Sequence, residues 1–500
     1  MKTLARSLLA ARQPCASHAA PAPLRRLARR AALASAFATA ATLAATAQAQ
    51  EAATPPATAA DDASAATGLW QRATLFGNLG GLRPALDQHG VTLTLQETSE
   101  YFGNLSGGTR RLGAYDGVTQ AAVSVDTSKL FGLAGGTFNV SALQIHGTNL
   151  TTRSLAAQQA ISGVEARPGT RLWELWYGQQ LAGGAVDLRV GQQSLDQEFM
   201  VSQYASSFAN STFGWPVLPS VDMPGGGPAY PLSALGARLK VQATPALTVL
   251  AGVFDGYPGG NPQDDAQQTN PHGTRFNLHD GALWIGELQY AVNKPSDAAA
   301  GDADAAKHVG LPGLYRLGLW YVSGHFNDLR DDSNGVPLTS PASNGIAQTH
   351  RGTYGAYAIG DQMVWRSSSY AARSLGVFAR VMGAPGDRNS VSVSAQAGVT
   401  LKAPFAGRDN DTAGLAVGYT NAMLNVDAAA GAAYGIGGAT RIHETVIEAT
   451  YLYQVAPWWT LQGDLQYIMR PSGGYAVQSD GAVRAIRNEV VAGLRTVVMF

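Results

Sequence analysis

The sequence has little cysteine, little charge and, in its mature part, no long apolar run. Its only cysteine, Cys15, lies in an N-terminal stretch that we expect to be removed on export, so the mature chain can form no disulfide. This excludes a disulfide-stabilised secreted scaffold. Beyond that stretch no apolar run approaches the ~20 residues that a membrane helix needs. If the mature chain crosses a membrane, it must cross with strands.

Residues 1–49 contain no acidic residue. Four arginines precede the small apolar run Ala31 to Ala45, and Ala47-Gln48-Ala49 supplies a small-x-small cleavage site. This order predicts a secretory signal peptide over residues 1–49. The paired arginines also occur in twin-arginine signals, but the rest of that motif is absent. Residues 50–68 are of low complexity, and we expect them to be disordered.

The charge balance argues against nucleic acid as a partner. The whole chain has 35 basic and 35 acidic residues, and loss of the seven basic residues of the signal leaves 28 against 35, a net charge of −7. Enzyme motifs are absent too: the nine histidines form no HExxH, and no CxxC or GxSxG occurs. We therefore predict no enzyme activity, no cofactor and no resident metal. The paired aspartates at 264–265 and 331–332, and Asp302 with Asp304, are expected to be solvated or to bind calcium loosely.

The C-terminus alternates between two kinds of residue. Val490, Ala492, Leu494, Thr496 and Val498 lead in steps of two to the terminal Phe500, while Glu489 and Arg495 lie in the other set. A period of two predicts a β-strand between two environments. A strand that ends on an aromatic residue is typical of the last strand of a bacterial outer-membrane barrel, where we expect the barrel-assembly machinery to recognise Phe500. An ordinary buried C-terminal strand remains the alternative for this strand alone.

A hairpin from Thr445 to Tyr467 shows the same pattern. Ile447, Tyr451 and Tyr453 alternate with polar residues up to a turn at 456–457, after which Trp459, Leu461, Leu465 and Tyr467 alternate with Gln462, Asp464 and Gln466. Aromatic residues near the ends of an apolar face indicate a membrane-interface girdle, and the polar face opposite indicates a wet lumen.

From Val91 onward the chain has only strands and turns in this interpretation. The pattern predicts roughly sixteen strands, which fits an outer-membrane barrel; they begin near residues 91, 117, 136, 171, 185, 235, 247, 280, 313, 353, 374, 390, 411, 441, 458 and 487. Alternate connections are short, as at 182–184 and 244–246, and most of the others are long: 148–170, 193–234, 257–279, 325–352 and 421–440. Two connections break the rule, 293–313 and 383–389.

If the apolar positions face lipid, the opposite set lines the lumen. That set includes Glu174, Arg189, Gln193, Arg238, Glu287, Arg380 and Asp464, together with several amides and hydroxyls. Both signs of charge with amides suit a neutral solute rich in hydroxyl groups, whereas an anion channel would be lined mainly by lysine or arginine. The alternative is a water-filled lumen that selects nothing.

The longest connection, 193–234, is unlike a floppy loop. It contains Asn210, Phe213, Trp215 and Tyr230 among prolines and glycines, which give it rigid corners and apolar bulk. Such a segment could fold inward and narrow the channel, and its aromatic faces could pack on a sugar ring. It could instead pack on the outer rim and only stabilise the barrel.

Several stretches together resemble the carbohydrate-selective porins of the OprB type. They are GGLRPAL at 80–86, GVTL at 90–93, SALQIHG at 141–147, ELW at 174–176, LRVGQ at 188–192, NSTFGWP at 210–216, GGPAYP at 226–231, FAR at 378–380, GAP at 383–385 and DRN at 387–389. The resemblance runs from about Leu69 to Phe500. It implies a sixteen-stranded barrel that admits glucose and related sugars without energy or cofactor. Residues 174, 189 and 380 match its motifs and lie on the inward set, and 210–216 would form the constriction.

The sequence therefore predicts an all-β, transmembrane antiparallel barrel over residues 69–500, with a short helical or irregular segment from Leu69 to Gly90. Its expected partners are small sugars and outer-membrane lipid, and its expected place is the bacterial outer membrane. A non-specific diffusion porin and a structural or surface-interaction barrel remain alternatives, and the oligomeric state stays open.

Overall fold

The computed structural model describes residues 68–259, 265–276, 278–279, 281–294, 310–370, 372–426, 438–477 and 482–500. The predicted signal peptide, nearly all of the segment 50–68, and Asp264, Asp302 and Asp304 lie outside the described residues. Within the described ranges, no helix is both long and apolar enough to cross a bilayer.

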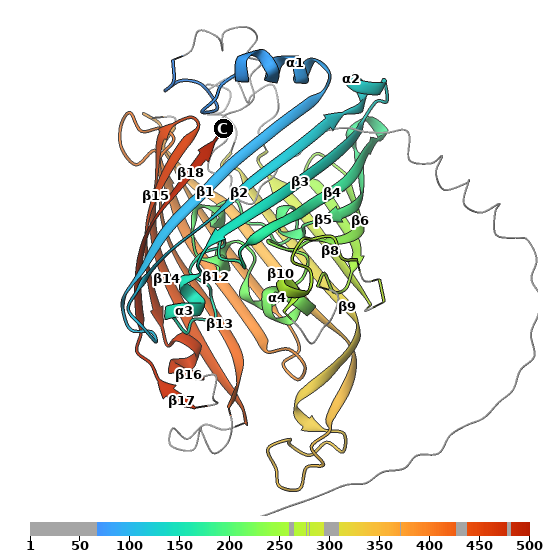
Figure 1. Cartoon of the computed structure of the whole chain (residues 1–500), viewed down its shortest axis with the longest axis vertical. Helices are drawn as coiled ribbons and strands as arrows, with labels where there is room; N and C mark the ends of the chain where they lie inside the picture. Colours follow the sequence, from blue (N-terminus) through green and yellow to red (C-terminus); the bar gives the residue numbers. More distant parts are fainter. Residues whose placement is uncertain are drawn as a thin grey trace, which may run out of the picture. The chain divides into compact units, whose positions relative to one another are not determined.

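Sixteen strands of the described chain form a closed antiparallel barrel (Figure 1). They are β1 (Val91–Ser106), β2 (Gly113–Asp126), β3 (Gly136–Gly147), β4 (Gly169–Leu181), β5 (Val186–Gln193), β6 (Ala234–Gln242), β7 (Leu247–Asp255), β8 (Ala282–Val292), β9 (Gly313–Asp332), β10 (Ala347–Arg366), β11 (Ser374–Gly383), β12 (Val391–Lys402), β13 (Thr412–Val426), β14 (Gly438–Ala456), β15 (Trp459–Met469) and β18 (Glu489–Met499). Each pairs with its neighbours in the chain, and β18 closes the ring by pairing with β1. The predicted fold and number of strands are confirmed; the largest error in a strand start is 353 against 347.

Short elements occupy the connections. The helices are α1 (Leu82–Gln88), α2 (Thr127–Phe131), α3 (Leu150–Ser154), α4 (Val217–Asp222) and α5 (Ala266–Thr269), with 3-10 turns η2 (Leu79–Gly81), η3 (Ala182–Gly184), η4 (Leu195–Gln197), η5 (Ala205–Ser207), η6 (Ser211–Phe213), η7 (Pro224–Gly226) and η9 (Pro471–Gly474). Between β15 and β18, a separate two-stranded sheet pairs β16 (Tyr475–Val477) with β17 (Val483–Ala485). The predicted N-terminal helical segment is confirmed by α1.

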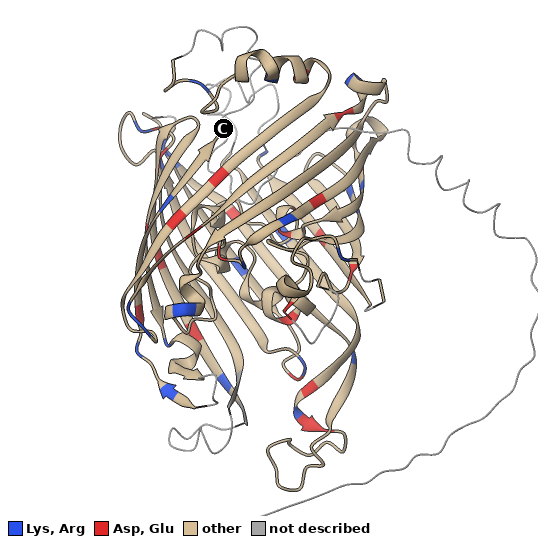
Figure 2. Ribbon diagram, in the orientation of Figure 1, with Lys and Arg blue, Asp and Glu red and all other residues tan. Residues whose placement is uncertain are grey.

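The alternation of side chains places an apolar face outside and a polar face inside. On the hairpin of β14 and β15, Ile447 is 37% exposed and pairs with Tyr467, whereas Glu448 is fully buried and pairs with the equally buried Gln466. Figure 2 shows charged residues of both signs on the strands between the two ends of the barrel, including acidic positions partway along β1. The parity predicted for this hairpin is confirmed.

Two predicted outer loops are shorter than expected. The connection predicted at 325–352 is only 333–346, because β9 and β10 stay paired as far as Asp332 and Ala347. The one predicted at 421–440 shrinks to 427–437 in the same way. These extensions of the strands mix polar and apolar residues without strict alternation. The alternation that marks a lipid-facing strand therefore stops before the hydrogen-bonded pairing of the strands stops.

Candidate functional site

The long loop between β5 and β6, residues 194–233, is held by the buried polar face of the strands. Carboxylates from β8, β10 and β14 accept hydrogen bonds from its backbone N–H groups: Met200 to Glu287 (2.9 Å), Gln203 to Asp361 (3.1 Å) and Asn210 to Glu448 (2.9 Å). All three carboxylates are at most 2% exposed. Each buried carboxyl group is therefore satisfied by hydrogen bonds from the loop backbone, so loop and wall stabilise each other.

Arg380 of β11 holds the same loop through its carbonyl groups. Its Nη1 donates to the carbonyl oxygens of Met200 (2.9 Å) and Gly214 (3.0 Å), and its Nη2 donates to that of Thr212. Its Nε donates to Gln396 of β12 at 2.8 Å. The side chain is only 2% exposed, so its donors are engaged by protein atoms. The predicted contact between Arg380 and sugar stays a prediction, while the geometry makes Arg380 an anchor of the long loop.

The aromatic residues of the long loop pack on one another. Phe213 lies 5.0 Å from Phe208 and 6.1 Å from Phe378 of the wall, between ring centroids. The three rings are 1–5% exposed. Phe213 therefore fixes the loop to the wall as part of a small apolar core.

The other predicted constriction residues are held by polar contacts. The Asn210 amide donates to Gln466 at 2.9 Å, and Trp215 Nε1 donates to the carbonyl oxygen of Gly226 at 3.1 Å. The Tyr230 hydroxyl donates to the carbonyl oxygen of Val164 at 2.9 Å. Because Val164 belongs to the neighbouring loop, residues 148–168, Tyr230 joins the two loops.

The predicted lumen arginines of β5 and β6 form one charged cluster. Arg238 is 1% exposed and contacts Asp187 and Glu198, the latter through Nη2 at 2.8 Å. The Arg189 guanidinium lies 4.2 Å from the ring centre of Trp176 and 3.6 Å from Glu198. Two residues of this cluster, Asp187 and Glu198, were missed. Asp187 shares the parity of Arg189, so the alternation could have found it, but Glu198 comes from the long loop and gave no such signal.

The remaining predicted lumen residues have ordinary polar partners. Glu174 accepts from the backbone N–H of Ser194 at 3.2 Å, and Gln193 donates to the carbonyl oxygen of Gly236 at 3.3 Å. Asp464 accepts from Gln466 at 2.9 Å. Thus Glu174 meets the start of the long loop, whereas Asp464 lies beside the Glu448 anchor on the paired strand.

A buried ion pair at the closure of the barrel was not predicted as a site. Arg495 of β18 donates through Nε to Glu100 of β1 at 2.7 Å, and the two side chains are 2% and 0% exposed. Arg495 Nη2 also reaches Ser162 Oγ of the neighbouring loop at 3.1 Å and the carbonyl oxygen of Ala209 at 3.4 Å. It therefore links the seam with both loops.

A cavity of about 660 Å³ lies between the two loops and the wall. Its lining includes Gln96, Thr98 and Gln120 of the first two strands and Trp215 and Tyr230 of the long loop. This volume lies within the usual range for small-molecule sites. A second hollow, of about 810 Å³, lies among outward-facing apolar side chains such as Leu317, Val381 and Val417 and belongs to the exterior of the barrel.

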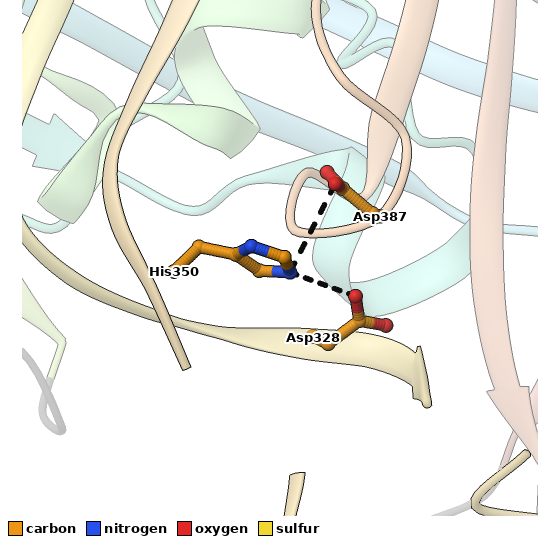
Figure 3. Close-up of side chains that lie close together, drawn as sticks. All are labelled: Asp328, His350 and Asp387. Atoms are coloured by element: carbon orange, nitrogen blue, oxygen red, sulfur yellow. Dashed lines mark hydrogen bonds and ion pairs between the residues drawn. The ribbon is translucent and has the colours of Figure 1, made fainter. Parts of the chain in front are cut away.

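Asp328, His350 and Asp387 lie together at the ends of β9 and β10 and in the connection 384–390 (Figure 3). His350 Nε2 lies 2.8 Å from Asp328 and 3.9 Å from Asp387. Arg388 donates to both oxygens of Asp387 at 3.0 and 2.9 Å and lowers the pKa of that carboxyl to about 2. Because a guanidinium already pairs with Asp387, the geometry favours an ion-pair network over an open cation site.

The expectation that Asp332 is solvated is wrong. It is 0% exposed, and its carboxylate accepts from the backbone N–H groups of Asn334, Val336 and Asn344 at 2.8–2.9 Å. It therefore organises the turn between β9 and β10.

A sequence profile described as "Carbohydrate-selective porin, OprB family" matches residues 110–500. The chain belongs to the OprB family. It is 26% identical over 446 residues to Porin B of Pseudomonas aeruginosa. The aligned region covers 85% of this chain and 91% of that protein. The OprB family and the barrel together imply a channel of the outer membrane and not an enzyme.

Two solved structures of Pseudomonas putida OprB share the fold of this OprB-family chain. The high-pH structure has a TM-score of 0.72 at 24% identity and covers 87% of this chain and 100% of its own. The low-pH structure has a TM-score of 0.51 at 18% identity, with 86% and 99% covered. At these identities the likeness shows the architecture alone.

The neighbouring loop carries a titratable group on the cavity wall, and we predict that it makes ion selectivity depend on pH. Burial raises the pKa of Glu165 to about 7, although its carboxylate accepts from the backbone N–H of Thr151 at 2.9 Å. Above pH 7 the side chain is charged and favours cations, and below pH 7 it is neutral. We therefore expect the cation preference, measured as reversal potential in a KCl gradient, to fall between pH 8 and pH 6.

Glu165→Gln should abolish the step near pH 7. Asp222→Asn is the matched control, because burial raises the pKa of Asp222 to about 8. Loss of the Asp222 carboxyl should alter the plot of reversal potential against pH only in its upper part, near pH 8. An unchanged step near pH 7 in Glu165→Gln would contradict the assignment.

Proposed function

We propose that the barrel carries sugars such as glucose across the outer membrane by facilitated diffusion, through a lumen that the long loop narrows. The observation that carries the proposal is the set of bonds between the loop backbone and the ionisable wall residues Glu287, Asp361, Arg380 and Glu448. Such bonds fix a loop within a channel more firmly than apolar packing on an outer rim would. Membership of a carbohydrate-selective family supports the choice of solute.

In this proposal the sugar path passes the cavity and also meets the Arg189 cluster of β5 and β6. The side chain of Arg189 is 16% exposed and that of Arg238 is 1% exposed. Of these two predicted lumen arginines, Arg189 therefore has more freedom to meet a solute. Guanidinium groups donate to hydroxyl oxygens, and amides such as Gln96 and Gln120 can donate or accept. Mixed charge suits neutral sugars over anions.

The test is single-channel current in a planar bilayer, with glucose and other sugars added at millimolar concentration. A selective channel should show block that saturates with sugar yet stays weak, because tight binding would slow exit. Ranking the sugars by block then identifies the preferred solute. Open current that no sugar blocks would reduce the function to general diffusion, and a sealed barrel with little current would point to a structural role.

Arg189→Ala should weaken sugar block by about tenfold, the size expected when a hydrogen bond from a charged group is lost. Lys240→Ala is the control, because it removes the same charge from the next strand of the barrel wall. Equal weakening in both variants would show that bulk electrostatics, and not a contact at Arg189, governs the block.

Export and assembly complete the proposal. Residues 1–49 would direct secretion, the outward apolar face would meet outer-membrane lipid, and Phe500 would be read by the barrel-assembly machinery. A barrel must cross the inner membrane unfolded, which fits the general secretory route.

A further inference from the structure

The seam where the barrel closes leaves one strand edge open at the end where the chain terminates. The pairing of β1 with β18 ends at Gln96 and Met499, and Phe500 adds one more bond from its N–H to the carbonyl oxygen of Leu95 at 2.9 Å. β1 continues beyond this point as residues 91–94, which pair with β2 on their other side. An open strand edge is a template for pairing with another chain.

The segment that precedes β1 fills this gap. Arg83 of α1 donates from Nη1 to the carbonyl oxygen of Leu93 at 3.3 Å and from Nη2 to the terminal carbonyl oxygen of Phe500. One guanidinium therefore bridges the unpaired edge of β1 and the last residue of the chain.

The same segment also bonds to the edge of β18 that faces β15, at the end of the chain. Met499 directs its N–H to the carbonyl oxygen of Trp458, on the β15 side, and its own carbonyl oxygen accepts from Leu75 N–H at 2.8 Å. Residues 75 and 83 thus bond to the end of β18 from both sides. Figure 1 shows α1 and the chain end C at the same end of the barrel.

Aromatic contacts secure the segment over the same strands. Trp70 stacks on Trp458 with ring centroids 6.2 Å apart, and Trp458 Nε1 donates to the carbonyl oxygen of Leu69 at 2.8 Å. Phe76 lies 5.4 Å from the ring of Phe500. The chain end is therefore covered by rings as well as by backbone bonds.

We propose that residues 69–83 form a cap that locks the closure seam and withholds the C-terminal residues from any other strand. The cap contacts β1, β18 and the turn before β15 at once, so its complete docking site exists only after β1 has paired with β18. It follows that the cap docks last and marks the finished barrel. This inference is independent of the solute that the channel carries.

The test compares the accessibility of Phe500 in purified, folded protein in detergent. Carboxypeptidase is added, release of phenylalanine is timed, and the loss of the compact band on unboiled SDS gels is followed with temperature. Arg83→Ala should release phenylalanine about tenfold faster, because loss of charge-assisted bonds at the chain end raises its local opening. Phe76→Ala should act in the same direction, and both should lower the temperature at which the compact band is lost.

Leu82→Ala is the matched control, since Leu82 lies next to Arg83 in the same segment but takes no part in the bonds and ring contacts described above. Arg83→Lys keeps the charge but has only one terminal amine, so it should fall between the wild type and Arg83→Ala; it also serves if the alanine variant fails to assemble. Equal release of phenylalanine by the wild type, Arg83→Ala and Arg83→Lys would overturn the proposal. Unchanged sugar block in these variants is expected, which separates this test from that of the channel function.

Discussion

Replacing Arg380 with alanine is expected to raise the single-channel conductance, make the current noisy and weaken sugar block, while the barrel still assembles. The side chain donates to three carbonyl groups of the long loop, at Met200, Thr212 and Gly214. Hydrogen bonds from a charged group contribute roughly 1.5–3 kcal/mol each. Their loss removes three of the bonds that attach the loop to the wall and lets its middle part move into and out of the channel. The measurement is conductance and current variance in planar bilayers, with the fraction of unboiled compact protein as the check on assembly.

Two further variants sharpen the Arg380 experiment. Arg380→Lys keeps the charge but supplies fewer donors, so it should give an intermediate conductance. Arg373→Ala removes an arginine that lies just before β11 and donates to the carbonyl oxygen of Ala403, away from the long loop, and should leave the current unchanged. If Arg380→Ala instead blocks assembly and the assembled fraction conducts like the wild type, Arg380 stabilises the barrel and does not position the loop.

The barrel could be predicted from the sequence because its wall obeys a local rule. In a strand between lipid and a wet lumen, apolar and polar side chains must alternate. The faces on which Ile447 and Glu448 lie could therefore be predicted from the strand alone, without knowledge of its neighbours. The rule holds only where one face of the strand meets lipid. The continuation of β9 to Asp332 is therefore invisible in the pattern, as is the small sheet of β16 and β17.

Only part of the candidate site could be predicted from the sequence. Parity placed Arg380, Glu287 and the polar residues of the hairpin from Thr445 to Tyr467 on the inner face. It could not say that the partners of Arg380, Glu287 and Glu448 include backbone atoms of the long loop. Those partners lie 87–239 residues away along the chain, and a backbone N–H or carbonyl carries no sequence signature. From the sequence, the aromatic side chains of the loop are expected to pack on a sugar ring. In the structure, the ring of Phe213 packs on Phe208 and Phe378.

Replacing Arg495 with methionine is expected to destabilise the barrel by about 3–5 kcal/mol, the cost of breaking a buried ion pair by removing one partner. The variant leaves Glu100 buried at the seam without its 2.7 Å partner, and it also removes the bonds from Arg495 to both loops. The measurement is urea unfolding in detergent micelles, followed by tryptophan fluorescence.

The double variant Glu100→Met with Arg495→Met separates the two causes of that loss. Replacing a whole buried pair by apolar side chains is often neutral, so the double variant should recover much of the stability that the single variant loses. The part that it does not recover measures the bonds from Arg495 to Ser162 and Ala209, which no methionine replaces. A single variant as stable as the wild type would show that Glu100 takes up a proton or a water molecule at no cost. In that case the seam would depend on its ladder of backbone hydrogen bonds, from Gln96 paired with Met499 to Ser106 paired with Val490, and not on the ion pair.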